Sequence, residues 1–202
     1  ARRLHARVKK QGSTGAGKEA GTGVATSGAQ PTSADASVSP ASADSGAGAA
    51  ASPTSNVAVV YFSVPLTDSE SRDADSGASI VMSGDDVFGN VQWAAQFVAS
   101  ATGADLIRIE AKNPYPTDDS IFDYALEEQN QNARPEIRLV AADGSAVESL
   151  DGYGTVLVGY PIWWYELPMP LYTFFEEYDL AGKSVGLFVV HGGSGMSGTV
   201  QD

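Results

Sequence analysis

Residues that could do chemistry gather in short stretches that directly follow apolar runs of the sequence. Ser63 comes after the apolar run 56–62, and a later segment, 89–92, reads Gly-Asn-Val-Gln where a helix is expected to begin. A hydroxyl, an amide and the free backbone N–H groups of a helix N-terminus attract an anion, of which phosphate is the obvious example. Because Gly-Asn at a helix start is also ordinary capping, this stretch alone leaves both interpretations open.

The second stretch, residues 160–165, holds four aromatic side chains in six positions and reads Tyr-Pro-Ile-Trp-Trp-Tyr. The strand before it and the helix expected after it already supply apolar side chains for a core, so we expect some of these rings to be exposed. An exposed indole favours stacking on a flat heteroaromatic ring, which contributes roughly 1 kcal/mol beyond the buried area. The alternative is that the Trp pair closes the bottom of a hydrophobic core.

The third stretch is His191-Gly192-Gly193-Ser194-Gly195, at the end of another apolar run. Glycines allow a backbone to lie flat against a ligand and to direct its N–H groups toward it. Ser194 with His191 as its base would suit a hydrolase, but Met196 occupies the position where a Gly-x-Ser-x-Gly elbow needs its second glycine. We therefore expect His191 to be a structural or ligand-edge hydrogen bonder, and we predict no catalytic side chain.

Strands and helices alternate along the part of the chain that carries these stretches. We expect strands at 56–62, 105–110 (nearer an edge), 153–160 and 183–190, with a possible small strand at 78–82. We expect helices from Asn90 to a stop at Gly103, from a cap at Thr117 to the Arg134-Pro135 pair, and over 167–178. This alternation predicts an α/β fold, a doubly wound parallel sheet in three α/β/α layers. In such sheets ligands bind beyond the carboxyl ends of the strands, where all three stretches lie.

The composition divides the chain into three parts. Residues 1–12 form a short basic helix or arm, and of the 43 residues from Ser13 to Ser55, 36 are Ala, Gly, Ser, Thr or Pro, which predicts a flexible linker without a core. Residues 56–202 are long enough for one sizeable domain. Six basic and three acidic residues precede position 56, whereas 6 basic and 22 acidic residues follow it, so the domain carries a net charge of −16.

The same composition excludes several classes of function. A domain at −16 repels phosphate backbones, so we expect no nucleic-acid binding. No apolar run approaches the roughly 20 residues of a transmembrane helix, and no signal-peptide pattern is present. With no Cys in the chain, thiol chemistry, disulfides and thiolate metal sites are absent, and we predict no metal site. Any redox chemistry must therefore use a cofactor.

One apparent nucleotide motif lies in the linker. Residues 12–18 read Gly-Ser-Thr-Gly-Ala-Gly-Lys, which has the glycine and lysine spacing of a phosphate-binding loop. Glu19 follows where that loop needs a Ser or Thr hydroxyl for magnesium, and no strand precedes the segment. A chance match in a Gly/Ser/Lys linker is the better interpretation.

The three stretches at one sheet edge jointly describe a pocket for flavin mononucleotide (FMN), because one suits phosphate, one suits ring stacking and one suits the polar edge of a ring. The sequence from Asn56 to Asp202 resembles the flavodoxin-like FMN-binding proteins, specifically a bacterial subfamily. The resemblance rests on the Tyr-Phe-Ser end of the first strand, the Pro-x-Trp-Trp and His-Gly-Gly-Ser-Gly loops, and the runs 127–136 and 167–174.

The resemblance implies a set of residues for each part of the cofactor. The phosphate would be surrounded by Ser63, Gly89, Asn90, Val91 and Gln92. The flavin ring would be flanked by Pro161, Ile162, Trp163 and Trp164, and its polar edge contacted by His191, Gly192, Gly193, Ser194 and Gly195. Relative to the family, the resemblance also implies that the last strand and its helices are missing from this sequence.

The function implied is electron transfer through bound FMN, as an electron carrier or a quinone-type reductase. Basic redox proteins or small quinone-like acceptors would be the partners. The alternative is a flavodoxin-fold interaction module that has lost tight flavin binding, favoured by the insertion between Ser63 and Gly89 and by Val91 in place of a phosphate-binding Thr. Either a cytoplasmic location or export with tethering through the linker is compatible with the sequence.

Overall fold

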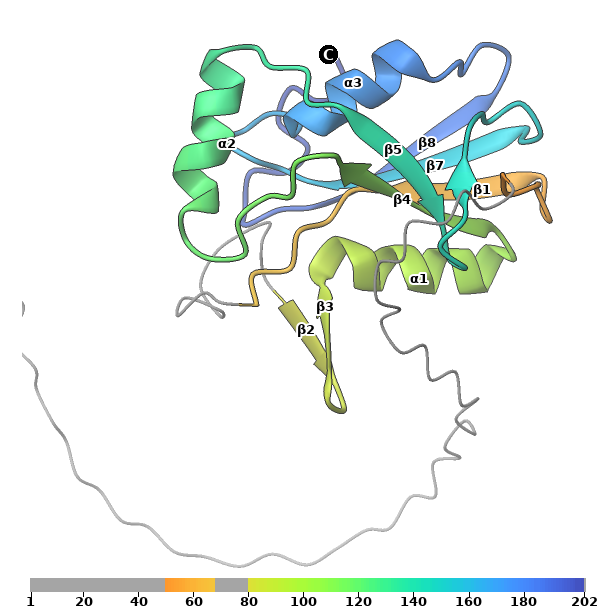
Figure 1. Ribbon diagram of the computed structural model, residues 1–202, viewed down its shortest axis with the longest axis horizontal. Coiled ribbons are helices and arrows are strands. Elements are labelled where there is room, and N and C mark those ends of the chain that lie inside the picture. The colour runs from red at the N-terminus through yellow and green to blue at the C-terminus, as the bar shows by residue number, and fades with distance from the viewer. Residues whose placement is uncertain (1–49, 68–79, 202) are drawn as a thin grey trace, which may run out of the picture. The chain divides into compact units, whose positions relative to one another are not determined.

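The apolar run after the linker forms strand β1 (Val57–Tyr61), which lies inside a six-stranded sheet (Figure 1). This computed structural model describes residues 50–67 and 80–201. Ala58, Val59 and Val60 are fully buried, and both edges of β1 are paired, with β4 on one side and β7 on the other. β1 is therefore the doubly covered central strand that its continuous apolar sequence predicts.

Five more strands complete the sheet, in the order β6-β5-β4-β1-β7-β8. They are β4 (Asp105–Ala111), β5 (Ile137–Ala141), β6 (Ala146–Val147), β7 (Thr155–Pro161) and β8 (Ser184–Val190). β4, β1, β7 and β8 are parallel, whereas β5 is antiparallel to β4, and β6 to β5. The sheet is thus mixed rather than wholly parallel. Because the β5–β6 hairpin extends it, β4 lies two strands in from the edge, and its expected place nearer an edge was wrong.

Helices cover both faces of this sheet, which confirms the three-layer α/β/α fold. α1 (Asn90–Thr102) lies on one face, and α2 (Ile121–Asn130) and α3 (Met169–Glu177) lie on the other (Figure 1). The α1 side has a small core, which contains Val59, Tyr61, Val91, Ala95 and Ala99. The larger core on the opposite side includes Phe62, Ile107, Tyr160, Leu171 and Phe174. The side chains of β1 alternate between these two cores, as the pleat of a strand requires.

The helix boundaries follow local backbone chemistry. α1 ends at Gly103, which has a φ of 65°, and the N–H of Gly103 donates to the carbonyl of Ala99, so the predicted glycine stop is confirmed. α2 begins after Ser120 rather than after Thr117. The Asp118 carboxylate accepts the Ser120 N–H at 3.0 Å, so a separate turn precedes the helix.

A small antiparallel hairpin leads directly into α1. It consists of β2 (Ile80–Ser83) and β3 (Asp86–Gly89), so the small strand expected near 78–82 is present and has a partner. The Phe88 ring lies 5.3 Å from the Trp93 ring of α1, measured between centroids. Gly89 is both the last residue of β3 and the N-cap of α1, and the hairpin therefore fixes where the helix begins.

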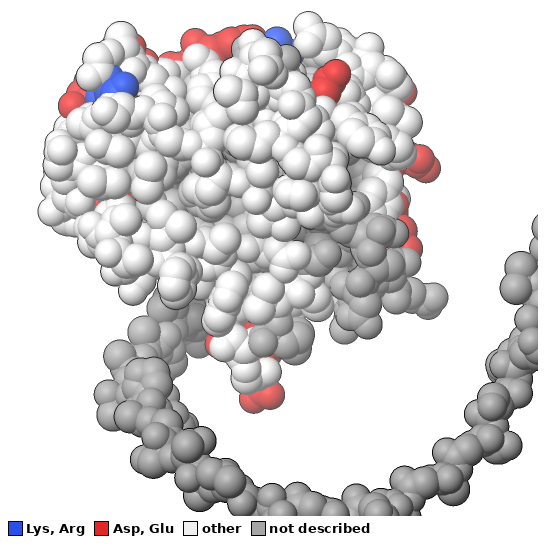
Figure 2. Space-filling model, turned by 180° about the vertical axis from the view of Figure 1, so that it is seen from behind, with Lys and Arg blue, Asp and Glu red and all other residues white. Residues whose placement is uncertain are grey.

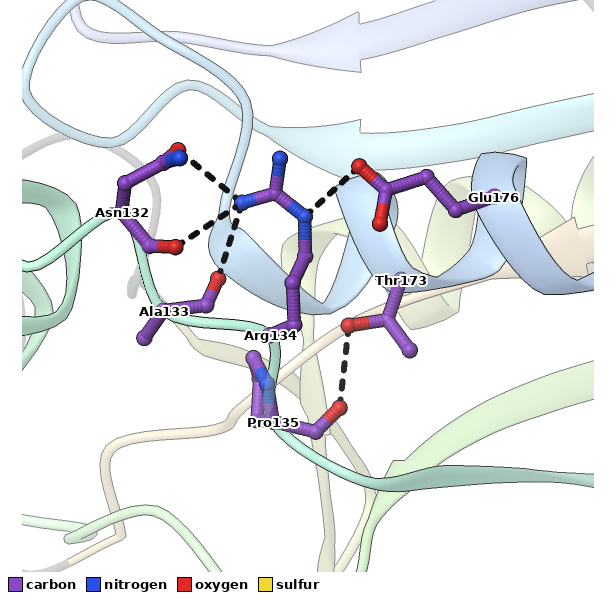
Figure 3. A network of polar contacts seen from close by, with 6 residues as sticks. All are labelled: Asn132, Ala133, Arg134, Pro135, Thr173 and Glu176. Atoms are coloured by element: carbon purple, nitrogen blue, oxygen red, sulfur yellow. Dashed lines mark hydrogen bonds and ion pairs between the residues drawn. The ribbon is translucent and has the colours of Figure 1, made fainter.

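An arginine fastens the connection after α2 to α3 (Figure 3). Arg134 donates from Nε to Glu176 Oε1 at 2.7 Å, and from one terminal nitrogen to the backbone carbonyls of Asn132 and Ala133, both at 3.1 Å. Beside it, the Thr173 hydroxyl donates to the Pro135 carbonyl at 3.0 Å. One planar guanidinium thus joins a loop to a helix more than forty residues away, which suits the fork of donors that Arg alone offers.

Several expectations fall on residues that the structure does not describe. The basic arm 1–12, the Gly-rich match at 12–18, the linker up to residue 49 and residues 68–79 of the insertion between Ser63 and Gly89 lie outside the described residues. All described residues belong to one unit, Ser45–Asp202. Within the described part, no helix is long and apolar enough to cross a membrane, and no cluster of three or more His, Cys, Asp or Glu side chains could hold a metal ion.

Candidate functional site

The carboxyl ends of β1, β7 and β8 open onto one edge of the sheet, because the three strands are adjacent and parallel. A cavity of about 490 Å³ lies there, in the size range of small-molecule pockets. Its walls are the loop after β7, the loop after β8 and the start of α2. They are formed by Ile121, Phe122, Ala125, Ile162, Trp163, Trp164, Tyr165, Gly192, Gly193 and Ser194. None of these lining residues carries a charge.

Part of the residue set inferred from sequence meets in this cavity. Six predicted residues line it: Ile162, Trp163, Trp164, Gly192, Gly193 and Ser194. The α2 wall of Ile121, Phe122 and Ala125 was missed, as was Tyr165. The i, i+4 spacing of Ile121 and Ala125 marked an apolar helix face, but that face packs against a core in most helices. Pro161, the last residue of β7, is buried and pairs with Val190 of β8.

The two neighbouring tryptophans have different environments. Trp163 is half-buried, and its ring packs edge to face on Phe62 and Tyr115, with centroids 5.4 and 5.5 Å away. Trp164 is 45% exposed, and its indole N–H donates to the Phe122 carbonyl at 3.0 Å. Trp163 therefore belongs partly to the core, as the alternative interpretation held. Trp164 is the more exposed indole of the cavity wall, and its hydrogen bond to the Phe122 carbonyl fixes it to α2.

Trp164 and Tyr165 occupy a strained turn. Their φ angles are +49° and +68°, and the flanking Trp163 and Glu166 exchange two backbone hydrogen bonds of 3.1 and 2.9 Å. A two-residue hairpin turn with both φ positive normally takes Asn or Gly. Tyr165 is 71% exposed, so its ring gains little from burial to offset this backbone cost. Strain of this kind is found most often at functional sites.

The loop after β8 is organised by its histidine. His191 Nδ1 accepts the backbone N–H groups of Gly193 at 3.0 Å and Gly195 at 3.1 Å. Two of the loop's N–H groups are therefore directed at the imidazole. The Ser194 hydroxyl donates to the Gly195 carbonyl at 3.3 Å. Ser194 and His191 are thus each engaged with the loop backbone in this geometry.

The predicted phosphate residues gather at the other side of the β1 end. Ser63 lies against Gly89 so closely that a Cβ on residue 89 would overlap the Ser63 hydroxyl oxygen. The Gly89 N–H donates to the Gln92 side-chain oxygen at 3.3 Å. The backbone N–H groups of the first turn of α1 have no carbonyl partner inside the helix, as at any helix N-terminus. Val91 is 1% exposed and faces the core, so it can offer an anion only its backbone N–H.

Hydroxyl and helix N-terminus therefore come together, as the sequence predicts, although these residues do not line the cavity itself. The two places are connected through the core. Trp163 lines the cavity and packs on the ring of Phe62, and Phe62 directly precedes Ser63 in the chain.

The fold and the site define the class of protein: an α/β protein with a doubly wound sheet and a pocket beyond the carboxyl ends of its central strands. The family model described as Flavodoxin matches residues 79–202, which is more than half of the chain. The chain therefore belongs to the flavodoxin family, a family of flavin-binding redox proteins. This confirms the resemblance noted in the sequence.

Two solved structures agree with this assignment. A presumed flavoprotein from Bacteroides uniformis ATCC 8492 is 26% identical, with a TM-score of 0.53 over 72% of this chain and 78% of that one. A presumed flavoprotein from Bacteroides eggerthii DSM 20697 is 27% identical, with a TM-score of 0.53 over 72% and 76%. A flavoprotein from Lactobacillus acidophilus NCFM, solved in complex with FMN, is more distant, at 14% identity and a TM-score of 0.41 over 66% and 89%. No curated protein matches the chain.

Proposed function

We propose that this chain binds FMN and transfers electrons through it. The observation that carries the proposal is the uncharged, aromatic-walled cavity beyond β7 and β8, with a hydroxyl and a helix N-terminus gathered beside the end of β1. A flat apolar ring with a phosphate on a side chain matches both parts. When bound, FMN would supply one- or two-electron transfer, and the protein would supply binding, orientation and electrostatics.

The phosphate end fits a doubly charged anion. The missing Cβ of Gly89 gives the Ser63 hydroxyl room to lie against the N-terminus of α1. That hydroxyl and the N–H groups of Asn90, Val91 and Gln92 would donate to the phosphate, and the positive end of the helix dipole would favour its charge. The side chain of Val91 adds no hydroxyl, so backbone donors would do most of the binding.

The ring end fits a heteroaromatic group. Trp164 would stack on the flavin ring, since its indole is exposed and fixed by the bond to the Phe122 carbonyl. Ile162 and the apolar α2 wall would exclude water from the ring. Gly192, Gly193 and Ser194 would lie along its polar edge, while His191 would hold that loop in shape through its two hydrogen bonds.

The net charge of the domain would affect the reduction potential of a bound flavin and the choice of its redox partner. With 22 acidic against 6 basic residues from position 56 onward, the domain would oppose added negative charge in the pocket and lower the reduction potential of the bound group. We propose a basic redox protein or a small quinone-like molecule as acceptor. Figure 2 shows acidic side chains mainly toward the margin of the face seen there. The uncharged cavity walls suit a small acceptor.

The test is a titration of the purified chain with FMN, followed by flavin fluorescence and visible absorbance. We expect saturable binding at one FMN per chain. Trp164→Ala should weaken binding about tenfold or more, because a stacked indole contributes on the order of 1 kcal/mol beyond its buried area. Phe97→Ala, which removes a ring that is 73% exposed on α1 and away from the cavity, is the matched control and should bind as the wild type does.

The rival function is a flavodoxin-fold interaction module without tight flavin binding. The buried, hydroxyl-free Val91 at the phosphate end favours it. A chain that purifies colourless and leaves FMN fluorescence unchanged would establish this rival and overturn the flavin proposal.

A further inference from the structure

A carboxylate lies in an aromatic cluster behind the cavity wall. Glu128 of α2 is half-buried, and its Oε2 accepts the hydroxyl of Tyr115 at 2.5 Å. The Tyr124 side chain, from the same helix, lies close enough to Glu128 to act on the pKa of its carboxyl group. Tyr115 is itself buried, at 8% exposure, and its ring lies 5.3 Å from that of Tyr124. Two phenol side chains thus lie beside one carboxylate.

No cation balances the charge of Glu128 in the described part of the chain. The ion pairs there join Arg108 and Arg138 to Glu110, Lys112 to Glu136 and Arg134 to Glu176. Tyr115 faces Glu128 from the segment before α2, and Tyr124 from α2 itself. The neighbours from the loop after β7 and the start of α3, which are Trp163, Trp164, Leu167, Pro168 and Met169, do not titrate. Burial raises the pKa of Glu128, and the hydrogen bond from Tyr115 and the nearby Tyr124 hydroxyl only partly oppose this.

The cluster is continuous with the candidate site. The Tyr115 ring packs on Trp163, which lines the cavity, with centroids 5.5 Å apart. A small hollow beside Glu128 is bounded by Ala125, Trp163 and Trp164, and the same three residues line the cavity from its other side. The carboxylate therefore lies one layer of side chains behind the wall of the cavity.

We propose that Glu128 is a redox-linked proton acceptor: when an electron enters a group bound in the cavity, Glu128 takes up a proton. The inference rests on the proposed flavin function. The donor's electron goes to the bound flavin, a proton moves from solvent to a Glu128 carboxylate oxygen, and the product is a neutral carboxylic acid with no bond to the flavin. The uptake keeps two negative charges from facing each other across a thin, poorly hydrated layer.

This role is an electrostatic and positioning one. A protonated Glu128 accepts the Tyr115 hydroxyl less strongly than the carboxylate does. Because the Tyr115 ring packs on Trp163, the fluorescence of Trp163 should change when Glu128 is protonated. The apparent pKa of Glu128 should be about one unit higher when the bound flavin is reduced than when it is oxidised. The reduction potential should therefore fall with rising pH in the window between these two pKa values, in addition to any titration of the flavin itself.

The experiment compares the full chain with Glu128→Gln, whose amide oxygen can still accept a phenol hydrogen bond. Glu127→Gln is the matched control, because Glu127 is the exposed neighbour on the same helix. Without flavin, tryptophan fluorescence is followed from pH 4 to pH 8. With FMN bound, the midpoint potential is measured over the same range against dithionite and dye mediators.

We expect one fluorescence transition in the wild type and in Glu127→Gln that is lost in Glu128→Gln, and a pH-dependent segment of the potential that is lost with it. If FMN binds but the potential of Glu128→Gln follows pH as the wild type does, the proton-uptake proposal is overturned and the flavin function stands. If the wild type binds no FMN, both proposals fall.

Discussion

The Ser63 hydroxyl occupies the space into which a side chain on residue 89 would project. Gly89→Ala must therefore push Ser63 away from the N-terminus of α1, where we place the FMN phosphate. We expect FMN affinity to fall about tenfold, with little loss of stability, because the overlapping atom is the end of a side chain that can rotate. Riboflavin, which has the same ring but no phosphate, should bind the variant and the wild type equally.

Titrations with the two flavins separate the phosphate end from the ring end. Gly198→Ala is the control, since a Cβ there meets no atom within 4 Å. Wild-type FMN affinity in Gly89→Ala would contradict the phosphate assignment.

Asp105 fastens the start of the domain to the sheet. Its carboxylate accepts the Thr54 N–H at 2.7 Å, the Ser55 N–H at 3.2 Å and the Tyr153 hydroxyl at 3.0 Å, and the Thr54 hydroxyl as well. Partial burial acts to raise the pKa of Asp105, but these hydrogen bonds outweigh it and hold the pKa below its ordinary value. The stabilisation is thus present above the ordinary carboxyl pKa and is lost as the pH falls through the lowered one.

Asp105→Asn should accordingly lower the free energy of unfolding at pH 7 by about 1 kcal/mol. The difference between variant and wild type should shrink in urea titrations at pH 3. Asp151→Asn, at an exposed position, should behave as the wild type does at both pH values. An Asp105→Asn deficit that stays constant down to pH 3 would show that the carboxylate charge is not its source.

The contacts of Arg134 predict that a positive charge alone cannot replace this side chain in stabilising the fold. Arg134→Lys keeps the charge, but one ammonium cannot reach Glu176 and the carbonyls of Asn132 and Ala133 together (Figure 3). We expect a loss of about 1–2 kcal/mol in urea unfolding. Arg138→Lys, whose side chain is 72% exposed, is the control and should cost little. Equal losses in the two variants would show that the hydrogen bonds of Arg134 add no stability beyond its charge.

Local signals account for the elements that the sequence predicts well. The bounds of α1 follow from a Gly-Asn start and the Gly103 stop, and β1 follows from a run of apolar residues too short for a helix. The β5–β6 hairpin escaped prediction because β6 has only two residues and Arg138 interrupts the apolar run of β5. Pairing of β5 with β4, and of β6 with β5, decides these strands rather than local preference.

The candidate site was predictable where it depends on strand ends and unpredictable where it depends on packing. Adjacent parallel strands bring their carboxyl ends to one edge, which is why residues of two predicted loops line one cavity. Sequence alone could not decide which of Trp163 and Trp164 faces the core, since neighbours in a turn can point either way. Nor could it place the α2 wall, because helical periodicity identifies an apolar face but not what that face meets.

Tyr165 gives a prediction in which stability and function oppose each other. Its φ of +68° in a two-residue hairpin turn is unfavourable for any residue with a Cβ, and its ring is 71% exposed. Tyr165→Gly should therefore raise the free energy of unfolding by about 1 kcal/mol, measured in urea without flavin. Tyr165→Phe keeps the Cβ and should leave stability unchanged. Because the Tyr165 ring lines the cavity, the glycine variant should also bind FMN more weakly than Tyr165→Phe does. A glycine variant no more stable than the wild type would show that the turn is not strained.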